Sequence, residues 1–192
     1  RLFHNGKRIS DKTSVEKKTD DITTKTYLVN LLPGKNEFKA EALSNDKINI
    51  HSNKLEIQCT ACQKEAPTLH LVLVGINKYQ NPWLDLKYGL PGAKEINKSI
   101  NANSSKLFKN IKVYRHYDRK AKKDPILNSF DDLSKIPPGD TVIIYFAGHG
   151  EVYKDNWYFI TYDLKDPTDE SSLEKKGISS TQIQDKIKEI GA

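Results

Sequence analysis

The stretch Leu69-His-Leu-Val-Leu-Val-Gly-Ile76 decides the fold of this chain. It is a continuous apolar run of strand length, which is typical of a strand covered on both faces. Two more buried strands are predicted at residues 111–117 and 141–147, with helices at residues 91–104 and from Asp124, the expected N-cap, onward. This alternation predicts an α/β fold with a parallel sheet.

The flanking segments differ from this central unit. Residues 1–58 predict short strands, because Asn5-Gly6 is a tight-turn pair and apolar residues alternate with charged ones over residues 37–42. They indicate a partial β-sandwich, which resembles the later part of an immunoglobulin-like domain. Residues 59–67 are the expected linker, and residues 68–192 form the α/β domain, with a last helix from Ser179 or Ser180.

Composition excludes several classes of protein. The 192 residues carry 31 Lys+Arg against 25 Asp+Glu, a net charge of +6 that comes almost entirely from Lys. Lys lacks the planar fork with which Arg reads bases, so a nucleic-acid partner is not expected. The longest apolar run is far short of a membrane span, and we expect a cytoplasmic protein with no membrane contact. The sequence has no Met, so we expect a fragment of a longer protein.

The two cysteines form the motif Cys59-Thr-Ala-Cys62. Three interpretations are open: an incidental pair in a linker, which we favour, a disulfide or redox switch, and half of a metal site. The sequence has no second Cys pair or His pair at zinc spacing, so neither a metal nor another cofactor is expected.

One histidine has the surroundings of a catalytic residue. His149 lies between Gly148 and Gly150, directly after the strand at residues 141–147. Functional groups of an open parallel sheet gather at the carboxyl ends of its strands. We therefore expect an exposed imidazole that acts as a general base, with glycine N–H groups suited to an oxyanion. The alternative is an incidental histidine in a glycine loop.

The segment Tyr145-Phe-Ala-Gly-His-Gly150 resembles the histidine motif of caspase-like cysteine peptidases, the group of metacaspases and bacterial caspase homologues. Three other segments resemble further parts of the same family: Val74-Gly-Ile-Asn-Lys-Tyr79, Leu86-Lys-Tyr-Gly-Leu-Pro-Gly-Ala93 and Trp157-Tyr-Phe-Ile160. The resemblance implies a caspase-like parallel-sheet fold and an endopeptidase that acts on polypeptides. It also implies that His149 is the catalytic histidine and that Gly150 helps to hold the oxyanion.

The nucleophile that this resemblance implies is missing from the chain. Caspase-type sequences place the Cys about 50 residues after the His, and no Cys follows His149. We expect a domain truncated before its cysteine strand, with the Cys beyond residue 192 or in a second chain, and no activity of this chain alone. The strand at residues 141–147 should then have an unfilled place beside it, exposing Val142 and Ile144.

The resemblance also directs attention to three substrate-binding candidates. Leu86 falls where caspases have the arginine that binds a substrate aspartate, and Gly92 falls where metacaspases tend to have an acidic residue. Asp85 is the carboxylate that could serve instead. The rival interpretation is a caspase-like pseudoenzyme or protein-interaction module without peptidase activity.

Overall fold

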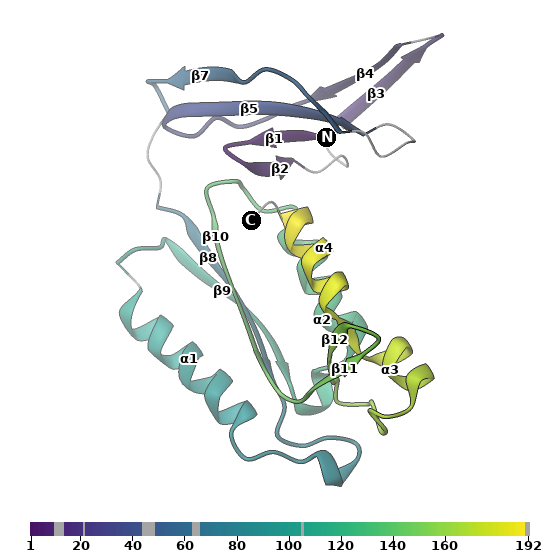
Figure 1. Cartoon of the computed structure of the whole chain (residues 1–192). Helices are drawn as coiled ribbons and strands as arrows, with labels where there is room; N and C mark the ends of the chain where they lie inside the picture. Colours follow the sequence, from purple (N-terminus) through teal and green to yellow (C-terminus); the bar gives the residue numbers. More distant parts are fainter. Residues whose placement is uncertain (10–13, 21, 44–48, 63–65, 105, 191–192) are drawn as a thin grey trace.

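The computed structural model describes residues 1–192 except 10–13, 21, 44–48, 63–65, 105 and 191–192, so part of the expected linker lies outside the described residues. The chain is a mixed α/β protein with several sheets. An antiparallel β region precedes a region that contains a parallel sheet and all four described α-helices (Figure 1).

The parallel sheet has three strands: β8 (Thr68–Gly75), β9 (Asn110–Tyr117) and β10 (Thr141–Ala147). Their order is β10-β8-β9, and both pairings are parallel, as the sequence predicts. The register pairs Gly75 with both Ala147 and Tyr117. The three carboxyl ends are therefore level, and the segments that follow them begin at one edge of the sheet.

Helices cover the two faces of this sheet. Helix α1 (Gly89–Asn103) lies on one side, and α2 (Lys123–Leu133) and α4 (Ser180–Ile190) lie on the other (Figure 1). Helix α3 (Glu170–Lys176) precedes α4. The predicted N-cap of α2 is wrong: Lys122 is the cap and Asp124 lies in the first turn, where its charge complements the helix dipole. No helix in the described ranges is both long and apolar enough to cross a membrane.

Helix α1 approaches the central strand without room for a side chain between them. A Cβ atom added to Gly75 would lie 2.7 Å from the Cβ of Ala93 and 2.9 Å from the carbonyl oxygen of Gly89. A Cβ added to Gly89 would lie 3.1 Å from the carbonyl oxygen of Ala147. Because Gly75 and Gly89 have no Cβ, the start of α1 is held against the carboxyl ends of β8 and β10.

The burial of the strands agrees with the sequence only in part. β8 is buried from Leu69 to Gly75, as predicted. β10 is not the buried strand that we expected, because among the described strands it pairs only with β8, and Ile143 remains 37% exposed. The expected exposure of Val142 and Ile144 is wrong, since both are half-buried and pack against the core.

The β region before Thr68 is antiparallel. Its main sheet has five strands: β1 (Leu2–His4), β2 (Lys7–Ile9), β5 (Gly34–Leu43), β6 (Asn49–His51) and β7 (Leu55–Cys59). β3 (Ser14–Thr19) and β4 (Ile22–Tyr27) form a separate two-stranded hairpin. The predicted turn at Asn5-Gly6 is present, with positive φ angles of 51° and 83°.

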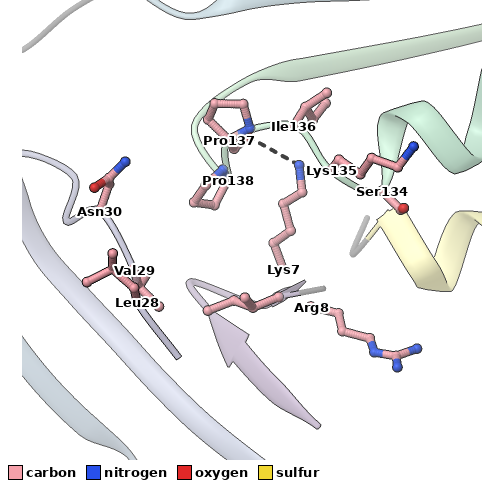
Figure 2. Close-up of a pocket in the computed structure, with 11 residues that line it drawn as sticks. Lys7, Arg8, Leu28, Val29, Asn30, Ser134, Lys135, Ile136, Pro137 and Pro138 are labelled. Carbon is pink, nitrogen blue, oxygen red and sulfur yellow. Dashed lines mark hydrogen bonds between the residues drawn. The ribbon is translucent and has the colours of Figure 1, made fainter. Parts of the chain in front are cut away.

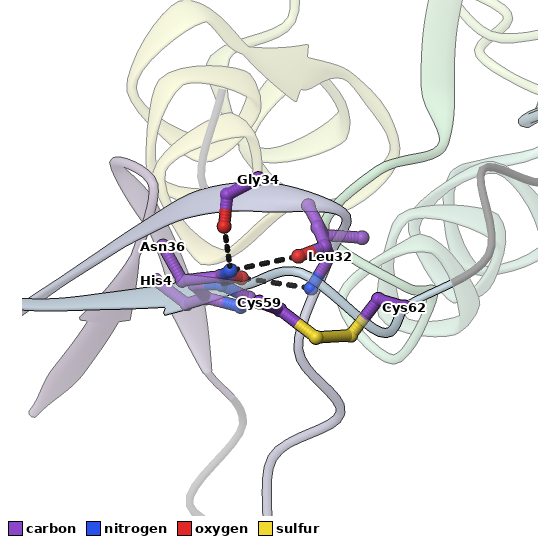
Figure 3. The surroundings of a disulfide bond; sticks show 6 residues. All are labelled: His4, Leu32, Gly34, Asn36, Cys59 and Cys62. Carbon is purple, nitrogen blue, oxygen red and sulfur yellow. Dashed lines mark hydrogen bonds between the residues drawn. A yellow bond between two sulfur atoms is a disulfide. The ribbon is translucent and has the colours of Figure 1, made fainter.

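The end of this β region is fastened by a disulfide. Cys59, the last residue of β7, pairs in register with Gly34 and is bonded to Cys62 (Figure 3). The favoured interpretation of an incidental pair is therefore wrong. The turn after β7 brings the two Cα atoms to 5.7 Å, which is within the range that a disulfide spans.

A buried amide lies beside this disulfide and ties β1 to β5 (Figure 3). Asn36 Oδ1 accepts hydrogen bonds from His4 Nε2 and Leu32 N–H, each 2.7 Å long. Asn36 Nδ2 donates to the carbonyl oxygens of Leu32 and Gly34. His4 and Asn36 are fully buried, and both polar atoms of the Asn36 amide have hydrogen-bond partners.

Three short strands follow the parallel sheet and fold back toward its carboxyl edge. β11 (Gly150–Tyr153) pairs with β12 (Asn156–Phe159), and β12 pairs with β13 (Ile178–Ser179). The ring of Phe159 packs edge-on against Phe146 of β10, with centroids 4.9 Å apart. This contact sets the position of the loop between β10 and β11.

Candidate functional site

The loop after β8 is closed onto the start of α1 by one side chain. Asn77 Oδ1 accepts the N–H of Leu90, and Asn77 Nδ2 donates to the carbonyl oxygen of Lys87. The backbone oxygen of Asn77 also accepts the N–H of Leu86. These three bonds fix the path of the segment between them, which contains the short helix η2 (Pro82–Leu84).

Two aspartates order the same loop. Asp118 follows β9 and accepts the N–H groups of Asn77 and Lys78 at 2.8 and 3.0 Å. Its φ angle is 45°, a left-handed conformation that Asp tolerates better than most residues and that is enriched at functional sites. Asp85 accepts hydrogen bonds from Lys78 Nζ and from the N–H of Tyr79. The bond from Lys78 is the main cause of the lowered pKa of Asp85.

His149, in the loop after β10, is held against the loop after β8 by two hydrogen bonds. Its backbone N–H donates to the hydroxyl of Tyr79, and its ring Nε2 lies 2.9 Å from the carbonyl oxygen of Leu84. A carbonyl oxygen only accepts, so the neutral ring carries its hydrogen on Nε2 and has a lone pair on Nδ1. The ring is half-buried rather than exposed as predicted, because Tyr79 and Leu84 cover one side of it.

The hydroxyl that accepts the His149 N–H belongs to a buried ring. Tyr79 is 5% exposed, and burial raises its pKa to about 12 while the hydrogen bond from His149 acts in the opposite direction. The phenol therefore stays neutral across the physiological range. In the sequence analysis, Tyr79 was only the last residue of a quoted segment, and Leu84 was not named. Their contacts with His149 join residues far apart in the chain, and no sequence motif indicates such contacts.

The glycines on either side of His149 are required by close contacts. A Cβ atom on Gly148 would lie 2.8 Å from the Tyr79 hydroxyl oxygen, and one on Gly150 would collide with the indole ring of Trp157. The N–H of Ile160 donates to the carbonyl oxygen of His149, so Gly150 and Phe159 form a non-hydrogen-bonded pair of the β11–β12 ladder. The N–H of Gly150 therefore points away from β12.

Exposed aromatic side chains border the histidine. Trp83 in η2 is 95% exposed and directly precedes Leu84, whose oxygen holds the imidazole. Trp157 is 39% exposed beside Gly150, and Tyr88 at the start of α1 is 81% exposed. Such side chains offer apolar and stacking contacts to a bound molecule.

The three substrate-binding candidates have different surroundings. Asp85 and Leu86 follow Leu84 directly, so they lie in the loop that contacts His149, and Leu86 packs against the core. Gly92 lies in the first turn of α1, where a Cβ would be 2.9 Å from the Tyr145 hydroxyl oxygen. Their contact with a substrate stays a prediction.

The site contains no thiol from this chain, because both cysteines of the sequence form the disulfide after β7. Cys59 and Cys62 precede β8 and lie toward the amino ends of the parallel strands, whereas His149 follows the carboxyl end of β10. Among the described residues, no group of three or more His, Cys, Asp or Glu side chains could hold a metal ion.

No protein-family model matches the chain, and no curated protein matches it.

Proposed function

We propose that this chain is the histidine-bearing part of a caspase-like cysteine endopeptidase, with His149 as its general base. In this proposal, the parallel sheet and its helices have the caspase-like arrangement, and the preceding β region is part of an immunoglobulin-like domain. The observation that carries the proposal is the hydrogen bond from His149 Nε2 to the carbonyl oxygen of Leu84. It leaves Nδ1 as the proton acceptor at the carboxyl edge of the sheet.

The chemistry follows from this tautomer. Nδ1 of His149 takes the proton of a cysteine thiol, and the thiolate attacks the scissile carbonyl carbon. The N–H of Gly150, which points away from β12, donates to the oxyanion of the tetrahedral intermediate. The intermediate then expels the amine, which takes the proton from Nδ1 and leaves a thioester. Water hydrolyses the thioester, with His149 again as base.

The thiol has to come from a polypeptide segment outside residues 1–192, because Cys59 and Cys62 are bonded to each other. β10 is the place for that segment. It is an edge strand, paired only with β8 in the part of the chain that the structure describes. A strand added along its outer edge would end near His149, and the partially exposed Ile143 would be covered by it.

The substrate of the proposed enzyme is a polypeptide. Trp83 in η2 and Trp157 in β12 are exposed on the two segments that contact the His149 loop, where they would contact side chains of a bound polypeptide. Both aromatic residues belong to elements fixed by hydrogen bonds, η2 and the β11–β12 ladder. They would therefore lose little conformational freedom when a peptide binds.

The test uses the natural full-length protein that contains this chain, assayed with a mixed peptide library. We expect His149→Ala to lower the rate by about 10²–10⁴-fold, the usual contribution of general base catalysis. His51→Ala is the matched control, because His51 lies on β6 and pairs with Glu41 in the antiparallel region. Undiminished cleavage by His149→Ala would refute the assignment. Absence of cleavage by the unmodified protein would favour the pseudoenzyme interpretation.

A further inference from the structure

A cavity of about 430 Å³ lies between the antiparallel β region and the α/β region (Figure 2), at the opposite end of β10 from His149. Three segments line it: β2, the connection from β4 to β5, and the connection from α2 to β10. Its lining is mainly apolar, with Ile9, Leu28, Val29, Ile136, Pro137 and Pro138. This volume is within the range of small-molecule sites.

The cavity contains one buried cation. Lys7 is 9% exposed, and its side chain extends from β2 toward the α2–β10 connection, where Nζ donates to the carbonyl oxygen of Pro137 at 3.2 Å (Figure 2). An ammonium group has three N–H donors. No carboxylate within the described ranges forms an ion pair with Lys7, although Asp140 attracts it from further away. A buried lysine is rare without a partner of opposite charge.

The other charged groups near the cavity already have partners. Asp140 accepts hydrogen bonds from His70 Nε2 and from the N–H of Thr68, at the amino end of the sheet. Lys135, a second lysine of the lining, pairs with Asp132 and is half exposed. Arg8, a third cation of the lining, is half-buried, and its guanidinium points away from Lys7 Nζ (Figure 2). Lys7 is thus the most deeply buried cation among the described lining residues.

We propose that this cavity binds a small carboxylic acid with a short apolar chain. The carboxylate would accept hydrogen bonds from Lys7 Nζ, and the apolar chain would lie along Val29 and Ile136. The one buried ammonium group among the described lining residues is surrounded by apolar side chains, so it matches the single charge of a carboxylate and leaves the rest of the ligand to apolar contacts. The ligand would contact both the β region and the α/β region, at the opposite end of β10 from His149.

The experiment measures binding of octanoate by isothermal titration calorimetry, with octan-1-ol as the uncharged probe of equal chain length. We expect octanoate to bind and octanol to bind more weakly. Lys7→Met should weaken octanoate binding by about 10–100-fold, the value of a charge-assisted hydrogen bond. Lys54→Met, a matched control that removes an exposed lysine paired with Glu37 outside the cavity, should bind octanoate as the unmodified protein does.

A second variant keeps the test valid if Lys7→Met fails to fold, which circular dichroism would reveal. Val29→Trp should fill the cavity from the β4–β5 connection and abolish octanoate binding. Three results would overturn the proposal: no octanoate binding to the unmodified protein, equal affinities for octanoate and octanol, or an octanoate affinity that is unchanged in Val29→Trp or in a folded Lys7→Met.

Discussion

Replacing Lys7 with Met should change how the stability of the protein depends on pH. Burial lowers the pKa of Lys7 from 10.5 to about 8, and the attraction of Asp140 only partly opposes this. In the unfolded chain the pKa returns to the ordinary value. Between these two values the unfolded state binds more protons than the folded state, so the contribution of Lys7 makes the protein more stable as the pH rises.

The magnitude follows from the two pKa values. Below pH 8 Lys7 is charged in both states, and its burial opposes folding in full. From about pH 7 to about pH 9.5, the pKa values of 10.5 and about 8 raise the contribution of Lys7 to the free energy of unfolding by about 2 kcal/mol. Because the cavity is open to solvent, screening of the ammonium reduces this effect, and we expect a change in the free energy of unfolding of about 1 kcal/mol.

The assay is urea-induced unfolding of the unmodified protein and of Lys7→Met at both pH values. The free energy of unfolding of the unmodified protein should gain about 1 kcal/mol relative to Lys7→Met when the pH is raised. Other groups titrate equally in both proteins and cancel. Lys135→Met controls for the loss of a positive charge from the same lining. A difference between the unmodified protein and Lys7→Met that is identical at both pH values would refute the reasoning.

Two further substitutions test the site and the disulfide. Tyr79→Phe removes the acceptor of the His149 N–H, so we expect a loss of about 1–3 kcal/mol in the free energy of thermal unfolding. If the proposed peptidase activity is correct, its kcat should also fall, and an unchanged kcat would show that Tyr79 does not position His149. The double variant Cys59→Ser with Cys62→Ser opens a small covalent ring and should cost about 2 kcal/mol in urea unfolding. Its peptide hydrolysis should equal that of the unmodified protein, and a loss of hydrolysis would mean that one of these cysteines takes part in catalysis.

The sequence predicted those parts of the fold that depend on local patterns. The apolar run at residues 69–76 became β8, and residues 141–147 became β10 with the same bounds. The alternation of strands and helices gave the parallel sheet, because a strand that is followed by a helix can pair in parallel with the next strand. The Asn5-Gly6 turn likewise depends on two adjacent residues.

The features that the sequence did not predict depend on contacts between distant residues. The exposure of Ile143 follows from the edge position of β10, which no pattern within the strand encodes. The tautomer of His149 depends on the oxygen of Leu84, 65 residues earlier in the chain. The disulfide depends on the geometry of the turn after β7, for which the Cys-x-x-Cys spacing is compatible with several outcomes.

The close contact between β8 and α1 limits which amino-acid substitutions this protein can accept. Gly75, Gly89 and Ala93 occupy one contact, where an added Cβ meets a helix atom or a backbone oxygen. A larger residue at any of the three would displace the start of α1, and with it the loop that Asn77 closes onto Leu90. Mutational drift at these positions is therefore constrained by the geometry around His149, although none of the three touches the imidazole.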